Sequence, residues 1–255
     1  MLNLLRSEWY KLLRNRSFWL LLTVLFVSAA GFVLLNYFDD PADGGALDSK
    51  NGLDLFAGAL GGDNYIIKLG LTVLAGFYIS AEYATGTIKR AVSSGHSRSQ
   101  FIVAKFIVFL LGSMIVALVF PVVCLSLGSM LLGTGSLPDV SVTTYVAKSF
   151  VLILTLSAAF AAVTGVIATL LTDSGKTIGA AFVFYFFADG LYAVAGKFMP
   201  FANKLYDYSI FNMINHYADP ALSASDFARS VYIPILVAIA FIAIGGFIFR
   251  RKEIK

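Results

Sequence analysis

The stretch "EYATGTIKRAVSSGHSRSQFIVAK", residues 82–105, is a polar and basic interruption between two long apolar segments. It carries four Lys or Arg residues, although a plain connector between hydrophobic segments needs only a few polar groups. The whole chain is 58% hydrophobic and 13% charged, whereas soluble domains average about 25% charged residues. Its apolar blocks of about 20 residues are long enough to cross a hydrocarbon layer of about 30 Å. We therefore predict an all-α polytopic membrane protein.

Six transmembrane helices are predicted, within one transmembrane domain that covers residues 1–255. Helices are expected rather than open strands, because lipid offers no partner for unpaired backbone groups. The single cysteine, Cys124, lies inside an apolar block and excludes a disulfide within the chain. The net charge of +4 is attributed to membrane topology, and no nucleic-acid partner is expected. The predicted spans are residues 17–38, 65–81, 101–133, 145–172, 177–198 and 231–249.

Three segments are basic: residues 1–16, residues 82–105 and the tail from Arg250. Each holds four basic residues against one acidic residue, a net charge of +3, whereas residues 39–63 hold six Asp against Lys50. The positive-inside rule then predicts that both termini and the 82–105 segment are cytoplasmic. A cleavable signal peptide is disfavoured, because the first apolar run continues to Phe38 and exceeds the usual core of 7–15 residues.

The N-terminal segment, "MLNLLRSEWYKLLRNR", has an amphipathic pattern. A helical projection gathers Leu2, Leu5, Trp9, Leu12 and Leu13 on one side and places Ser7, Lys11, Arg14 and Asn15 opposite. This pattern favours an elbow helix over residues 1–16 that lies in the inner membrane interface, with the Lys and Arg stems at headgroup depth. The alternative is a basic flank that only sets the topology.

The 82–105 stretch is predicted to form helix, turn and helix close to the membrane. Glu82 and Tyr83 end the second span, and Gly86 permits a sharp change of direction. "TIKRAV" is expected to form a short helix that ends at Gly95, and "SRSQ" fits a capping box that opens the third span. An ordinary positive-inside loop would have the same composition, and the residues alone do not decide between the two.

This stretch resembles the cytoplasmic segment that follows the second span in permeases of the ABC type-2 transporter family, as does the overall plan of elbow helix, six spans and basic tail. The resemblance implies a coupling helix that contacts a separate nucleotide-binding subunit. The residues it assigns to coupling are Glu82, Gly86, Thr87, Lys89, Arg90, Ser97 and Arg98.

The resemblance also implies partners and a location. Two copies of an ABC ATPase would bind ATP and Mg²⁺, and a second permease, identical or a sister chain, would complete the pathway. This chain would bind no cofactor or metal and would not itself be an enzyme. Members of the family include bacterial cell-membrane exporters of peptides, antibiotics and other amphipathic or lipid-like compounds, and lantibiotic immunity permeases. The sequence identifies neither the substrate nor the physiological role.

The stretch "TDSGKT", residues 172–177, is similar to the end of a phosphate-binding P-loop. A P-loop needs a second glycine five residues before Gly175, and that position is Leu170. We predict instead a tight cytoplasmic turn that Gly175 closes, and a second, smaller contact with the ATPase. The residues predicted for this contact are Asp173, Ser174 and Lys176.

Asp189 is the one acid well inside a predicted span, where ionisable groups are costly and usually functional. It is a candidate for the translocation pathway or for a structural polar contact. The small residues Ser157, Ala161 and Gly165 favour close helix packing, within the chain by default or along a dimer seam. Residues 199–230 are expected to form short outer helices that dip towards the membrane. A proton-coupled transporter using Asp189 and a non-transporting sensor or scaffold stay open as alternatives.

Overall fold

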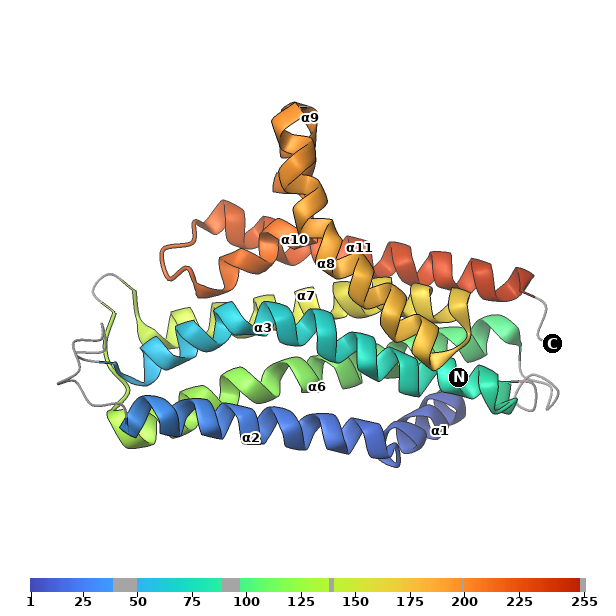
Figure 1. Ribbon diagram of the computed structural model, residues 1–255, viewed down its shortest axis with the longest axis horizontal. Coiled ribbons are helices and arrows are strands. Elements are labelled where there is room, and N and C mark those ends of the chain that lie inside the picture. Colours follow the sequence, from blue (N-terminus) through green and yellow to red (C-terminus); the bar gives the residue numbers. More distant parts are fainter. Residues whose placement is uncertain (39–49, 89–96, 138–139, 199, 253–255) are drawn as a thin grey trace.

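A computed structural model describes residues 1–38, 50–88, 97–137, 140–198 and 200–252, and within these ranges all regular structure is helical. Five long helices form an elongated bundle (Figure 1). They are α2 (Arg16–Phe38), α3 (Gly52–Ala75), α6 (Arg98–Leu132), α7 (Val142–Leu171) and α11 (Ala224–Arg251). The other elements are α1 (Leu2–Leu13), α4 (Ala81–Ala84), α8 (Ser174–Phe198), α9 (Pro200–Asp207), α10 (Ile210–Met213) and two non-α turns of helix, η2 (Gly76–Ser80) and η3 (Ile214–Ala218).

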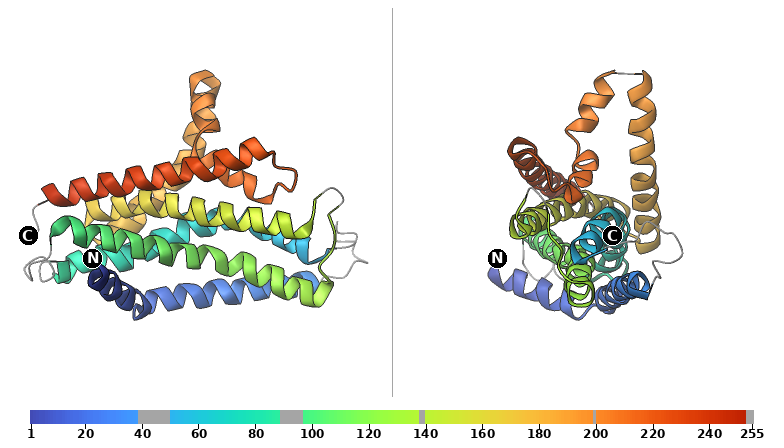
Figure 2. Two further views of the ribbon diagram at one scale, coloured as in Figure 1. Left: turned by 180° about the vertical axis from the view of Figure 1, so that it is seen from behind. Right: turned by 90° about the vertical axis from the view of Figure 1, so that its left-hand side faces the viewer.

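Five helices in the described part of the chain are long and apolar enough to cross a membrane: 16–38, 64–83, 98–132, 142–171 and 224–251. They coincide with five of the six predicted spans. The remaining prediction, residues 177–198, lies within α8, which is helical throughout but is not among the five. Helix α8 leaves the bundle obliquely and projects from it together with α9 (Figures 1 and 2). The sixth span therefore stays a prediction.

The second span belongs to a longer helix than the sequence predicts. Helix α3 begins at Gly52, inside the acidic segment, because Asn51 and Asp54 form a reciprocal capping box. At its other end the helix widens into the π-helical turn η2 before it continues as α4. Such π-turns often occur at functional sites.

Helices α6 and α7 form the centre of the bundle and pack through glycines. A Cβ on Gly165 of α7 would lie 2.7 Å from the ring of Phe106, and one on Gly245 of α11 would lie 2.6 Å from the same ring. Ser157 and Ala161 are also buried within the chain. Packing inside one chain is thus confirmed for this stripe of small residues.

The basic segments that the sequence places on one side of the membrane also share one end of the bundle. The N-terminus, the end of α11, α4 and the beginning of α6 all lie there (Figure 1). The junction of α7 and α8 lies at the same end. Residues 200–218 form the short helices α9, α10 and η3, but α11 begins at Ala224, so the outer segment is shorter than the predicted 199–230. That these short helices dip towards the membrane stays a prediction.

Candidate functional site

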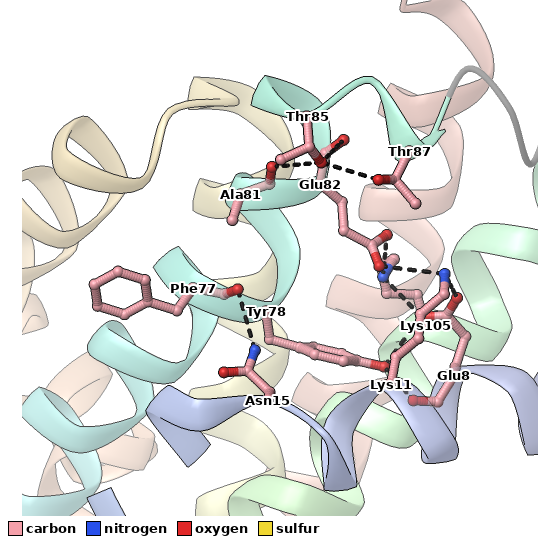
Figure 3. Close-up of polar contacts among 10 residues, drawn as sticks. All are labelled: Glu8, Lys11, Asn15, Phe77, Tyr78, Ala81, Glu82, Thr85, Thr87 and Lys105. Carbon is pink, nitrogen blue, oxygen red and sulfur yellow. Dashed lines mark hydrogen bonds and ion pairs between the residues drawn. The ribbon is translucent and has the colours of Figure 1, made fainter. Parts of the chain in front are cut away.

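Four charged side chains from three elements meet where the second span ends, and we call them the ionic cluster: Glu8, Lys11, Glu82 and Lys105 (Figure 3). The Lys105 ammonium lies 2.7 Å from Glu8 Oε2 and 2.6 Å from Glu82 Oε2. The Lys11 ammonium lies 2.5 Å from Glu8 Oε1 and 3.2 Å from Glu82 Oε1. Each lysine therefore bridges both carboxylates, and the four formal charges cancel.

The burial of this cluster is unequal. Lys105 and Glu8 are 0% and 1% exposed, whereas Glu82 and Lys11 keep 15% and 31% of their side-chain surface. Burying an ion pair is tolerated only when geometry and further hydrogen bonds compensate for lost hydration. Lys105 and Lys11 both donate hydrogen bonds to Glu8, whereas Glu82 Oε2 contacts Lys105 as an ion pair without a hydrogen bond. Glu8 is therefore the centre of the cluster and Glu82 its outer edge.

Tyr78 extends the cluster into η2. Its hydroxyl lies 3.1 Å from the Glu8 carboxylate and 3.2 Å from the Glu8 carbonyl oxygen, and donates to these acceptors. Its ring faces Lys105, whose ammonium lies 4.6 Å from the ring centroid, within cation–π distance. The π-turn thus supplies a side chain that serves both charges of the buried pair.

The surroundings of Glu8 and Lys11, the two α1 residues of the ionic cluster, favour their charged forms. Burial alone would raise the pKa of Glu8, but the nearby Lys105 charge and hydrogen bonds from Lys105 and Lys11 outweigh it, so the net pKa lies below its ordinary value. Burial would lower the pKa of Lys11, but the charge of Glu82 and a hydrogen bond to Glu8 leave it raised. Both groups are charged at neutral pH.

A second polar group, the hydroxyl cluster, consists of Ser80, Ser174 and Thr177 and joins the same π-turn to the junction of α7 and α8. The Ser80 and Thr177 hydroxyls lie 2.8 Å apart, and Ser80 also donates to the Ala168 carbonyl oxygen at 3.2 Å. Ser174 donates to the Gly76 carbonyl oxygen at 2.8 Å. The segment 172–177 therefore contacts the π-turn that lies directly before the 82–105 segment.

The turn chemistry predicted for the 82–105 segment is confirmed where it is described. Gly86 has φ of +66°, a left-handed conformation that favours glycine. The Ser97 side chain caps α6 by accepting from the Gln100 backbone N–H, although Gln100 does not complete a reciprocal box. The Thr87 hydroxyl lies 2.9 Å from that of Thr85. Lys89 and Arg90, with the predicted "TIKRAV" helix end at Gly95, lie outside the described residues.

Arg98 is exposed but contacts the C-terminal tail. Its guanidinium donates to the Lys252 carbonyl oxygen at 3.3 Å. The Lys252 ammonium in turn donates to the carbonyl oxygens of Thr169 and Leu170 at the end of α7, where a cation suits the helix dipole. The predicted coupling residue Arg98 therefore lies on a junction of α6, α7 and α11.

The 172–177 turn is shorter than predicted. Thr172 ends α7 in the left-handed region with φ of +57°, and the Asp173 side chain accepts from the Lys176 backbone N–H at the start of α8. Asp173 thus favours the turn, as predicted. Gly175 does not close it, because it already lies in the first turn of α8. Lys176 is exposed.

The prediction for the N-terminal helix is wrong about Lys11. Helix α1 buries Leu4, Glu8 and Leu12, so its inward face is rotated relative to the predicted apolar face, and Lys11 joins the ionic cluster instead of facing headgroups. Leu2 and Leu13, predicted on the apolar face, are exposed. The reason is that the buried acid Glu8 attracts Lys11, one helical turn further on.

Asp189 lies in α8, but its side chain is outside the described part of the structure, so its two candidate roles stay untested. The sequence did not predict that Glu8, Lys11 and Lys105 belong to one site. A signal for them exists: Glu8 is the lone acid of a basic segment, and Lys105 lies beyond the cap of an apolar span. Opposite charges near the predicted ends of several spans on the same side of the membrane are candidates for pairing.

The comparison with protein families agrees with the plan of the chain. A family described as ABC-2 family transporter protein matches residues 4–189, which include α1, both polar clusters and the first four long helices. No curated protein matches the sequence closely enough to count as a relative. Because the family match covers most of the chain, the protein belongs to the ABC-2 transporter family and is a multi-pass membrane component of an ABC transporter.

Proposed function

We propose that this protein is the permease subunit of an ATP-driven exporter, with both termini and the 82–105 segment in the cytoplasm of a bacterial cell. Two ATPase subunits would bind ATP and Mg²⁺ and push on the segment after α4. A second permease, identical or a sister chain, would form the pathway with this one. An amphipathic peptide, antibiotic or lipid-like compound is the proposed cargo.

The observation that supports this role best is the ionic cluster. It ties α1, α4 and α6 together at the point where the predicted coupling segment leaves and re-enters the bundle. Buried opposite charges resist separation, since parting them exposes an unpaired charge to a low-dielectric interior. A push on the 82–105 segment would therefore move the elbow helix and the third span with it. The ATPase would bias two arrangements of the helices, and the cluster would transmit that bias.

The test begins with gentle purification, which should recover an ATPase with the protein. The complex with that ATPase, reconstituted in vesicles, should then lose transport in the variants Glu82→Gln and Arg98→Glu while ATP hydrolysis continues. Asp226→Asn, which removes an exposed acid from the other end of α11, is the matched control and should transport normally.

Three outcomes would contradict the proposal. Full coupling in both Glu82→Gln and Arg98→Glu, with normal membrane insertion, would remove the coupling role. Transport that continues without ATP and stops when the proton gradient is collapsed would favour the secondary transporter. Repeated failure to recover any ATPase would favour the sensor or scaffold.

A further inference from the structure

A groove of about 350 Å³ lies between α1 and α6, and we call it the elbow groove. It lies beside a close approach of these helices, where a Cβ on Gly112 would come within 2.7 Å of the Leu12 side chain. Every lining residue except one is apolar or aromatic, so hydrocarbon is its natural occupant. The lining residues are Leu5, Arg6, Trp9, Ile107, Val108 and Leu111.

The charges of α1 and the start of α2 that the ionic cluster does not neutralise are positive. Helix α1 carries one acid, Glu8, which the ionic cluster already neutralises. Arg6, Arg14 and Arg16 form no ion pair with any described residue. Arg6 is exposed beside the groove, whereas Arg14 stacks on Tyr10 at 4.8 Å. The ligand that matches this surface has an apolar body and a negative head.

The orientation of α1 places the groove at the edge of a leaflet. Helix α1 lies across the long axis of the bundle, directly before α2 enters its span at Arg16 (Figure 2). Trp9 and the arginine stems then lie at the depth where aromatic rings and basic side chains meet lipid headgroups. Ile107 and Leu111 extend the groove along α6 towards the hydrocarbon.

We propose that the elbow groove binds one anionic phospholipid of this leaflet. An acyl chain would lie against Ile107, Val108 and Leu111, and the phosphate oxygens would accept hydrogen bonds from the planar Arg6 guanidinium. Because α1 also carries Glu8 and Lys11, the bound lipid would brace the helix that supplies half of the ionic cluster. The lipid site does not depend on the direction or cargo of transport.

The chain has two tryptophans, Trp9 in the groove and Trp19 on the exposed side of α2, which allows a direct test. The variant Trp19→Phe, reconstituted in bilayers, leaves Trp9 as the reporter. Brominated phosphatidylglycerol should quench its fluorescence at a lower lipid fraction than brominated phosphatidylcholine. Arg6→Gln should reduce this preference about fivefold, as expected for one basic contact at an anionic surface. Arg14→Gln removes an equal charge outside the groove and should keep most of the preference for phosphatidylglycerol.

Equal quenching of Trp9 by the two lipids, or equal losses in Arg6→Gln and Arg14→Gln, would overturn the proposal. A further result would also overturn it: Trp9 stays unquenched in Trp19→Phe, whereas Trp19 is quenched in Trp9→Phe. The groove would then be covered by protein, such as a second copy of the chain. Native mass spectrometry repeats the test without removing Trp19. The unaltered chain should retain one phosphatidylglycerol molecule and Arg6→Gln should lose it; equal retention by both would again contradict the site.

Discussion

The ionic cluster and the hydroxyl cluster hold the same short segment of the second span, η2 and α4, but they do so with different groups and neighbours. The ionic cluster joins it to α1 and α6 through the ion pairs of Glu82 with Lys11 and Lys105, at 3.2 and 2.6 Å, and through the Tyr78 hydroxyl, which donates to Glu8. The hydroxyl cluster joins it to α7 and α8 through neutral hydrogen bonds between Ser80, Thr177, Ser174 and backbone carbonyl oxygens.

The difference lies in what each cluster permits. Each charge in the ionic cluster lies against two charges of opposite sign, and separating it from them leaves an unpaired charge in a largely buried site, which is costly. The Ser80 hydroxyl already has two acceptors within reach, Thr177 and the Ala168 carbonyl oxygen, and can exchange one for the other at little cost. We therefore expect α1, α4 and α6 to move as one body, and the contact with α7 and α8 to be the one that slides.

The largest expected effect comes from Lys105→Met. This change leaves Glu8 and Glu82 together in a largely buried site with only Lys11 to balance them. Breaking a buried ion pair from one side costs about 3–5 kcal/mol, so the free energy of unfolding in mild detergent should fall by that amount. Lys176→Met, which removes an exposed lysine at the same end of the bundle, should change it by less than about 0.5 kcal/mol.

The double variant Lys105→Met with Glu8→Gln sharpens this result. It removes one charge of each sign and leaves the Lys11–Glu82 pair. Its free energy of unfolding should recover part of the loss, because the unbalanced buried carboxylate is gone. If the loss in the double variant equals the sum of the losses in Lys105→Met and Glu8→Gln, the two charges act independently and no cluster exists.

Gly76→Ala tests how closely the hydroxyl-cluster side is packed. A Cβ at Gly76 would lie 2.7 Å from Ile178 Cγ1 and 3.1 Å from the Ser174 carbonyl oxygen, so α8 must shift. We expect a loss of about 1–3 kcal/mol in the free energy of unfolding. The control is Gly179→Ala, where a Cβ meets nothing within 4 Å and better helix propensity should stabilise by up to about 1 kcal/mol.

Ser80→Ala is expected to be milder. It removes one neutral hydroxyl and should lower the free energy of unfolding by about 1 kcal/mol. Ser80→Ala with Thr177→Val should cost little more, since the two paired hydroxyls are removed together and the Ala168 carbonyl oxygen still accepts from the Thr172 backbone N–H. Ser126→Ala, whose exposed hydroxyl bonds only within its own helix, is the control and should be near neutral. If Ser80→Ala lowered the free energy of unfolding as much as Lys105→Met, the two clusters would not differ in strength.

Local signals in the sequence predict much of this architecture. The apolar run that begins at residue 17 becomes α2 from Arg16 to Phe38, because hydropathy and length decide which segments cross lipid. The left-handed Gly86 and the Ser97 cap follow in the same way from residue chemistry. Such features need only a few neighbouring residues to be recognised.

The features that the sequence did not predict depend on residues that are far apart along the chain. Lys105 meets Glu8 across 97 positions, and Tyr78 meets it across 70. No local pattern marks η2 as a π-turn, because its extra residue is accommodated by packing against α7 and α8. The oblique course of α8 is likewise a tertiary result, since its apolar length alone predicts an ordinary span.

The smallest expected effect concerns pH and isolates Glu8. The pKa of Glu8 in the folded protein lies below its ordinary 4.5, so its stabilising contribution is complete above that value and is lost as pH falls through the folded pKa. The pKa of Lys11 is raised, so its contribution is complete below 10.5 and is lost only as pH rises further. The difference in free energy of unfolding between the unaltered chain and Glu8→Gln should therefore stay constant from pH 6 to 8.

Taking this difference cancels the groups that titrate in the same way in both chains. Thermal unfolding in detergent at several pH values measures it, and the difference should shrink only below about pH 4.5, as Glu8 takes up a proton in the unfolded chain first. A slope between pH 6 and 8 would mean that Glu8 exchanges a proton under physiological conditions. The cluster would then be a candidate proton relay instead of a fixed brace, and the contrast with the neutral hydroxyl cluster would need another physical basis.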